Sequence, residues 1–172
     1  PSQAWLRERL LECRLPAAGP KPAGPKPERR PALEVLANNA PVLQNHIRDR
    51  PLRLGEKEYT RGLYCHAISK VVVRLPGPGK AFTAVVGLDN NPDTARGRGS
   101  VVFSVKVGDE VRFRSDVMRY ETPPRDARVD LGGADVFVLE VGDAGDGIGW
   151  DQSDWADAKV TLQDGKELWL GD

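Results

Sequence analysis

From Leu33 to the C-terminus, apolar and polar residues alternate in short runs, and this period of two most strongly limits the possible fold. Successive side chains of a β-strand point to opposite faces, so such runs are typical of strands with one buried face. Gly and Pro residues separate the runs where tight turns are needed. The expected strands are Lys70–Leu75, Ala81–Leu88, Ser100–Val107, Glu110–Arg114, Arg128–Leu131, Val136–Val141, Ala158–Leu162 and Glu167–Leu170.

The spacing of these runs predicts the fold class. Many short strands with no helical stretch between them are typical of a β-sandwich or barrel. In Glu110–Arg114, Val111 and Phe113 alternate with charged residues, which favours an antiparallel sheet with one face in water. We therefore predict an all-β fold, an antiparallel β-sandwich over residues 32–172.

The N-terminal part of the chain has a different pattern. In residues 1–15, Trp and Leu recur at spacings near three and four, which predicts an amphipathic helix. Residues 16–31 are rich in Pro, with Gly, Ala and Lys, and predict a semi-rigid extended linker that is too poor in apolar residues to pack. We expect the helix to contact another domain or a partner, or else to fold back on the sandwich.

The composition argues against several partners. Lys and Arg number 25, as do Asp and Glu, so the formal net charge is zero. A balanced chain lacks the electrostatic footprint of a nucleic-acid or membrane binder, and no apolar run approaches the roughly 18 residues that span a bilayer. Two cysteines, Cys13 and Cys65, cannot form a disulfide framework. We expect free thiols, with a single bridge as the alternative.

The segment Gly145–Asp157 has the densest polar and aromatic chemistry in the chain. A sugar ring presents apolar C–H faces and a rim of hydroxyls, so binding it takes an aromatic plate and polar side chains. Trp150 and Trp155 could supply the plate, and Gln152 and the aspartates could supply the polar groups. This segment therefore predicts a glycan-binding loop.

A structural interpretation of the same segment remains open. Trp155 and Asp157 stand at the entry to an expected strand, where Trp155 could fill the core and Asp157 could bond backbone N–H groups. The residues that we expect to face a ligand are Trp150, Asp151 and Gln152. A second long loop, Asp89–Gly99, contributes Arg98 as a further candidate ligand-binding side chain.

Catalysis and metal binding find less support in these residues. Glycoside hydrolysis needs two carboxyl groups roughly 5–10 Å apart, one of them with a pKa raised by an apolar pocket. The loop is glycine-rich and expected to be solvated, so no catalytic residue is predicted. The chain contains no EF-hand pattern and no Cys/His spacing for Zn²⁺. No cofactor is required; Asp89, Asp143 and Asp146 are candidate ligands of a structural Ca²⁺, and simple turns are the alternative.

Five blocks in order resemble the NPCBM domain, which overlaps carbohydrate-binding module family 51. The resemblance implies a β-sandwich of jelly-roll type, appended to glycoside hydrolases or other secreted enzymes. It also implies recognition of galactose-containing glycans and is compatible with structural Ca²⁺. The blocks are Asn39–Val42, Pro51–Gly55, Tyr59–Ala67, Phe82–Asp89 with Gly99–Phe103, and Asp143–Asp157.

The resemblance also implies that His66, Asp154 and Trp155 are important. The family often has His where this chain has Gln152, and that exchange bears on sugar specificity because an amide offers different donors and acceptors from an imidazole. We predict a non-catalytic galactoside-binding module outside the cell, at the cell surface or in the periplasm, beside a catalytic domain of a larger protein. The alternative is a structural or protein-interaction sandwich that binds no sugar.

Overall fold

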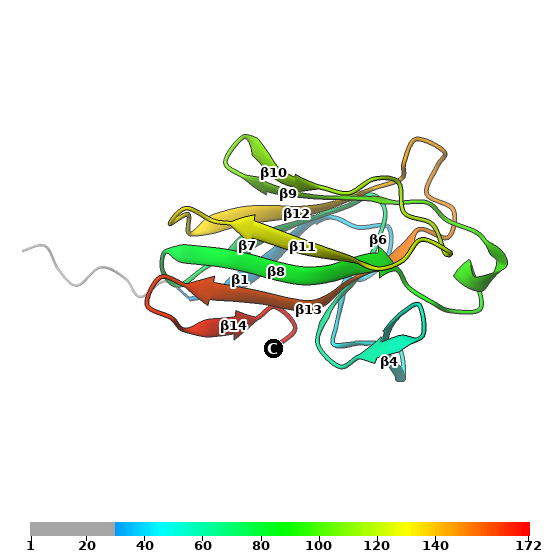
Figure 1. Ribbon diagram of the computed structural model, residues 1–172, viewed down its shortest axis with the longest axis horizontal. Coiled ribbons are helices and arrows are strands. Elements are labelled where there is room, and N and C mark those ends of the chain that lie inside the picture. The colour runs from blue at the N-terminus through cyan, green and yellow to red at the C-terminus, as the bar shows by residue number, and fades with distance from the viewer. Residues whose placement is uncertain (1–29) are drawn as a thin grey trace, which may run out of the picture.

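The computed structural model describes residues 30–172, and Figure 1 shows it as two layers of strands. The predicted helix, and all of the predicted linker except residues 30 and 31, lie outside the described residues. Every strand pair in the described chain is antiparallel, which confirms the predicted all-β sandwich. No helix within residues 30–172 is long and apolar enough to cross a membrane.

The first sheet has five strands, and its two edge strands come from the start and from the middle of the described chain. The order across the sheet is β1 (Ala32–Ala37), β7 (Ser69–Arg74), β12 (Val136–Gly142), β9 (Val102–Val107) and β10 (Glu110–Arg114). Both edge strands are paired on one side only.

The second sheet packs against the first and carries a small third sheet on its outer face. Its order is β11 (Arg125–Asp130), β8 (Gly79–Leu88), β13 (Gln152–Leu162), β6 (Gly62–His66) and β2 (Leu43–Gln44), with β14 (Glu167–Trp169) paired to β13. The third sheet is β3 (His46–Ile47), β4 (Arg50–Leu54) and β5 (Lys57–Tyr59). A 3₁₀ turn, η1 (Thr94–Arg96), lies between β8 and β9.

Two apolar clusters hold these layers together. The larger fills the space between the two main sheets, where the Trp155 ring packs edge-on against Phe103, with 5.0 Å between centroids, and at a tilt against Phe82, with 6.0 Å between centroids. The smaller cluster joins the third sheet to the outer face of the second through Leu52, Leu54 and Ala156. Because of this cover, β13 is buried on both faces over much of its length.

Each predicted strand has a counterpart, but two strands begin three or more residues earlier than predicted. β11 begins at Arg125 instead of Arg128. β13 begins at Gln152, six residues before the predicted start at Ala158, so the loop that precedes it ends at Asp151. A bulge after Ala156 is the reason: it inserts one residue, with Asp157 at a φ of 48°, and breaks the alternation of apolar residues.

Cys65 is a free, fully buried thiol on β6. Burial raises the pKa of this thiol to about 12. The expectation of a free thiol is confirmed for Cys65, while Cys13 lies outside the described residues.

Candidate functional site

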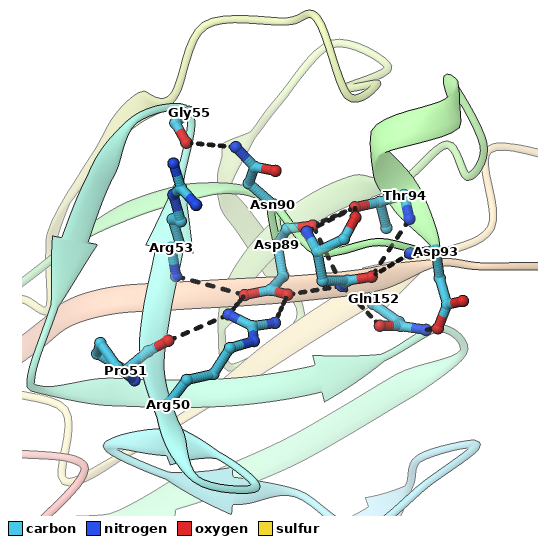
Figure 2. Close-up of polar contacts among 10 residues, drawn as sticks. Arg50, Pro51, Arg53, Gly55, Asp89, Asn90, Asp93, Thr94 and Gln152 are labelled. Carbon is cyan, nitrogen blue, oxygen red and sulfur yellow. Dashed lines mark hydrogen bonds and ion pairs between the residues drawn. The ribbon is translucent and has the colours of Figure 1, made fainter.

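Two loops lie against each other at one end of the sandwich. One joins β8 to β9 and contains η1; the other joins β12 to β13. The Gln152 side chain links them, because Asn91 Nδ2 donates to Gln152 Oε1 at 2.7 Å and Gln152 Nε2 donates to Asp93 Oδ2 at 3.3 Å. Figure 2 shows the β13 residue Gln152 beside this turn. The two loops therefore form one surface.

Trp150 is the exposed aromatic residue of this surface. Its side chain is 46% exposed, and the Arg98 guanidinium lies over its ring at 4.5 Å from the centroid. Its φ of 63° is in the left-handed region, which a bulky residue adopts at a cost of about 1–3 kcal/mol. Gly99 supports this conformation, because a Cβ at that position would overlap the Trp150 carbonyl oxygen.

His66 and Gln152 are brought together across two strands. They are paired in the register of β6 and β13, and both are partly exposed. His66 Nδ1 lies 3.0 Å from the Ala67 carbonyl oxygen and 3.4 Å from Asn39 Nδ2. Gln152, which stands where the family often has His, therefore lies next to His66 on the same surface.

Three of the predicted sugar-binding residues lie in the interior. Asp151, Asp154 and Trp155 are each 0% exposed. Trp155 fills the core between the sheets, and the neighbouring Asp154 points to the opposite face, under the third sheet. The protein encloses all three side chains, which favours a structural role for them, and their contact with a sugar stays a prediction. Asp154 and Trp155 are among the residues that the family resemblance marks as important, and a structural role fits that importance.

Asp154 belongs to a buried carboxyl pair with Asp89. Asp89 accepts hydrogen bonds from both terminal nitrogens of Arg50, from Asn91 Nδ2 at 2.6 Å, and from the Arg53 backbone N–H at 3.3 Å (Figure 2). Burial, and then the charge of Asp89, raise the pKa of Asp154 well above its ordinary value. The Asp154 oxygens find no donor among the described residues.

Burial and the neighbouring Asp89 favour the neutral form of Asp154. A protonated carboxyl group is itself a donor, so it does not need a donor from another residue. Burial, and then the charge of Asp89, also raise the pKa of Tyr64, which pairs with Asp154 across β6 and β13. The network fixes the turn that follows β8, and hence one wall of the surface.

The Asp151 side chain links the end of the β12–β13 loop to the β8–β9 loop. Its Oδ1 accepts a hydrogen bond from the Ser100 backbone N–H at 2.8 Å. Burial raises the pKa of Asp151 to about 6; the Ser100 hydrogen bond acts against this and the charge of Asp146 adds to it. Asp151 thus holds the base of the Trp150 loop.

The three candidate calcium ligands lie in separate environments. Asp89 is paired with Arg50, Asp143 Oδ1 accepts from the Gly145 backbone N–H at 3.0 Å, and Asp146 accepts from Ser100 Oγ at 2.6 Å. Within residues 30–172, no group of three or more His, Cys, Asp or Glu side chains is positioned to hold a metal ion. The described residues do not assemble the predicted site, and calcium binding stays a prediction.

A hollow of about 510 Å³ opens beside Gln152, between the β8–β9 turn and the third sheet. Its volume is in the range of small-molecule sites, roughly 300–1,000 Å³. Its polar lining includes Arg48, Asp49, Asn91 and Asp93, which sequence reasoning did not single out. The length of the Asp89–Gly99 loop was a sequence feature that pointed to this region. The third sheet comes to lie against that loop only in the folded chain, so its contribution to the hollow could not be predicted from the sequence.

A rigid β-sandwich with an exposed indole, amides and a polar hollow at the loops of one end has the architecture of a carbohydrate-binding module. The family model of the NPCBM/NEW2 domain matches residues 31–161. The chain therefore belongs to the NPCBM/NEW2 family, and the predicted resemblance is confirmed.

Known proteins place the family in larger chains. Over 109 residues, the chain is 37% identical to a Renibacterium salmoninarum protein named "Putative endo-alpha-N-acetylgalactosaminidase". The match covers 63% of this chain and 7% of that protein. Modules of this kind are thus appended to longer proteins.

Two solved structures from Clostridium perfringens are similar over most of the sandwich. The CBM51-2 domain of ZmpB, solved with GlcNAc and the INT domains, is 28% identical with a TM-score of 0.66, covering 74% of this chain and 29% of that one. The CBM51 domain of a GH95 protein, solved with methyl-galactose, is 25% identical with a TM-score of 0.61, covering 74% and 92%.

Proposed function

We propose that this module binds glycans without catalysing their cleavage, through a loop surface made of Trp150, Arg98, His66, Gln152 and Asp93. The observation that carries the proposal is Trp150, an exposed indole held in a strained backbone conformation. Strained residues persist where the surrounding structure fixes them, and they cluster at ligand sites. A folding role alone gives no reason to hold this indole in solvent.

The chemistry of the loop surface suits a sugar. The indole offers a plate for the apolar C–H face of a pyranose, and the Gln152 amide, His66 and Asp93 offer donors and acceptors for hydroxyls. Asp151 and Asp154 are fully buried, so neither can reach a glycosidic bond. Binding without hydrolysis is the function that these groups support best.

We infer that the ligand belongs to the galactose class. The axial 4-hydroxyl of galactose leaves the hydrogens on C3, C4 and C5 together on one face, which matches a single indole plate. Similarity to a module solved with methyl-galactose supports this inference, while a similar module solved with GlcNAc makes that sugar the alternative. We expect weak affinity, on the order of micromolar to millimolar, because one stacked sugar leaves little net free energy after ordering costs.

We further propose that the module acts within a secreted protein, where it holds a neighbouring catalytic domain near glycans. The chain spans 7% of the relative that it matches, which supports a place in a longer polypeptide. Tethering would raise the local concentration of glycan at the neighbouring domain.

Isothermal titration calorimetry of the 172-residue chain with methyl-galactoside and with GlcNAc tests this function. We expect saturable binding of the galactoside, weaker binding of GlcNAc, and at least about a tenfold loss, or about 1.4 kcal/mol, for Trp150→Ala or Gln152→Ala. Arg112→Ala, on the exposed edge strand β10, is the control and should bind normally.

The two parts of the proposal fail separately. Tighter binding of GlcNAc than of galactoside would overturn the sugar class and leave glycan binding intact. If the folded protein gives no saturable binding on titration or on a glycan array, glycan binding itself is wrong, and the interaction-module alternative takes its place.

A further inference from the structure

The hollow beside Gln152 lies on the outer face of the second sheet, next to the exposed indole but not under it. It measures about 510 Å³, and Trp150 is not part of its lining. Tyr64 on β6 and Leu43 on β2 are register partners, and both line it. A sugar stacked on the indole does not by itself account for this hollow.

The Tyr64 hydroxyl is a polar group without a partner in the described chain. Tyr64 is 6% exposed, and its hydroxyl forms no hydrogen bond among residues 30–172. The oxygen keeps contact with solvent through the hollow, unlike the enclosed oxygens of Asp154. Burial raises the pKa of Tyr64, so the hydroxyl is a protonated donor. Buried donors are normally paired, and an acceptor on a ligand would pair this one.

An aliphatic wall stands beside this donor. Side chains of register partners on antiparallel strands have their Cβ atoms roughly 4.5–5.5 Å apart, so Leu43 flanks the Tyr64 ring. Ile47, on β3, packs in the same apolar cluster as both of them and also lines the hollow. A group that fits here presents an acceptor to the hydroxyl and an apolar carbon to the wall. The remaining aliphatic lining comes from Ala40, Pro41 and Pro92.

Hydrogen-bond acceptors also line the hollow. Gln152 Nε2 donates to Asp93 Oδ2 at 3.3 Å (Figure 2), and Asp93 Oδ1 has no partner among the described residues. Asp49 forms no ion pair within residues 30–172. The lining can therefore accept a hydrogen bond from a ligand N–H as well as donate one from Tyr64.

The charges of the lining favour a neutral ligand. Arg50 is bound to the buried Asp89. Among the other charged lining residues, Arg48 is cationic and Asp49 and Asp93 are anionic, which leaves a net charge of −1. A carboxylate or sulfate on a sugar would be repelled by this excess negative charge.

An acetamido group has the matching set of atoms and no net charge. We propose that the hollow is a subsite for an N-acetylhexosamine unit. The acetamido carbonyl accepts a hydrogen bond from Tyr64, and the N–H donates to Asp93. The methyl group packs against Leu43 and Ile47. This inference rests on the proposed glycan binding, because the hollow shares Gln152 and Asp93 with the loop surface.

NMR titration of the 172-residue chain with matched sugars tests the subsite. GlcNAc differs from glucose only by an acetamido group in place of the 2-hydroxyl, and N-acetylgalactosamine differs from galactose in the same way. The Tyr64 ring and the Leu43 methyl groups report on the hollow. In at least one pair, we expect the acetamido sugar to bind at least about tenfold tighter than its parent, because it adds a methyl contact and a hydrogen bond. The pair that shows the difference identifies the hexosamine.

A single-atom variant tests the donor. Tyr64→Phe should weaken binding of the acetamido sugar about three- to tenfold, and should leave the urea midpoint unchanged because the hydroxyl has no partner in the described chain. Tyr59→Phe is the matched control: Tyr59 is also 6% exposed but does not line the hollow, so binding should be unchanged.

Saturation-transfer NMR on the unchanged chain needs no variant and keeps the test open if Tyr64→Phe fails to fold. We expect the acetamido methyl protons to receive more saturation than the ring protons. Ring protons that receive as much as the methyl group would overturn the proposed orientation.

The inference and the proposed function fail separately. If methyl-galactoside binds as expected but neither acetamido sugar exceeds its parent, or if Tyr64→Phe binds the acetamido sugar normally, the subsite is wrong and the proposed function stands. If the acetamido preference persists in the hollow while methyl-galactoside does not bind, the subsite stands and the galactose class is wrong. A folded chain that binds no sugar at all overturns both.

Discussion

At the scale of single residues, the site depends on carboxyl groups that do not touch the ligand. Asp154 is buried beside Asp89, and only a neutral Asp154 leaves that pair with one charge for Arg50 to balance. Two ionised carboxylates in contact would add a repulsion that burial strengthens. The protonation state of Asp154 is therefore part of the architecture of the loop surface.

Exchanging each carboxyl group for an amide separates the two roles. Asp154→Asn keeps a neutral donor toward Asp89 and should change the free energy of unfolding by less than about 1 kcal/mol. Asp89→Asn leaves Arg50 without its anion and should cost about 2–4 kcal/mol, somewhat less than the roughly 3–5 kcal/mol for breaking a fully buried ion pair, because the Arg50 side chain is partly exposed. Urea unfolding at pH 7 measures both. Equal losses would show that Asp154 is ionised.

Asp151 predicts a pH dependence with a definite sign. Its folded pKa of about 6 exceeds the ordinary value of 3.8, so the folded state binds the proton more tightly than the unfolded state. Its contribution to stability is full below pH 3.8 and is lost as the pH rises through 6, by up to about 3 kcal/mol. Asp151→Asn keeps an acceptor for the Ser100 N–H and should flatten this slope, measured as the difference between the two unfolding profiles from pH 4 to 7.

At the scale of elements, β13 contributes Trp155 to the core and Gln152 to the loop surface. Trp155→Ala should reduce the free energy of unfolding by about 3–5 kcal/mol, because it removes a fully buried indole from between the sheets. Trp150→Ala, on the exposed loop, should cost less than about 1 kcal/mol. Thermal and urea unfolding of the two variants compare them directly. A large loss at Trp150 would make that residue a folding element instead of a binding one.

The same strand shows how far the sequence predicts the fold. Core residues of β13 stand at 155, 158, 160 and 162, so the alternation is regular only after the bulge, and the strand is predicted to begin there. The strands β2 to β5 are two to five residues long and give no clear alternation. Burial of Asp151 and Asp154 depends on partners from distant segments, such as Ser100 and Asp89, which no local pattern in β13 reveals.

At the scale of the whole molecule, the loops at one end of the sandwich carry the exposed indole and the polar hollow. A largely apolar groove, lined in part by Leu33, Leu168 and Trp169, lies toward the other end. β13 connects them, since it begins at Gln152 and its far half pairs with β14. A rigid scaffold of this kind lets the loop surface change its ligand while the core stays constant.

Cys65 provides a measure of how cooperatively this scaffold opens. It is on β6 in the middle of the core, and burial holds its pKa near 12, so a thiol reagent can react only after an opening that exposes it. In a Cys13→Ser chain, we expect the opening free energy from labelling under rapid-reclosing conditions to equal that from urea unfolding, because β6 lies between β13 and β2. A clearly smaller labelling value would mean that β2 and β6 open as a local unit, and that the hollow beside Tyr64 and Gln152 opens with them.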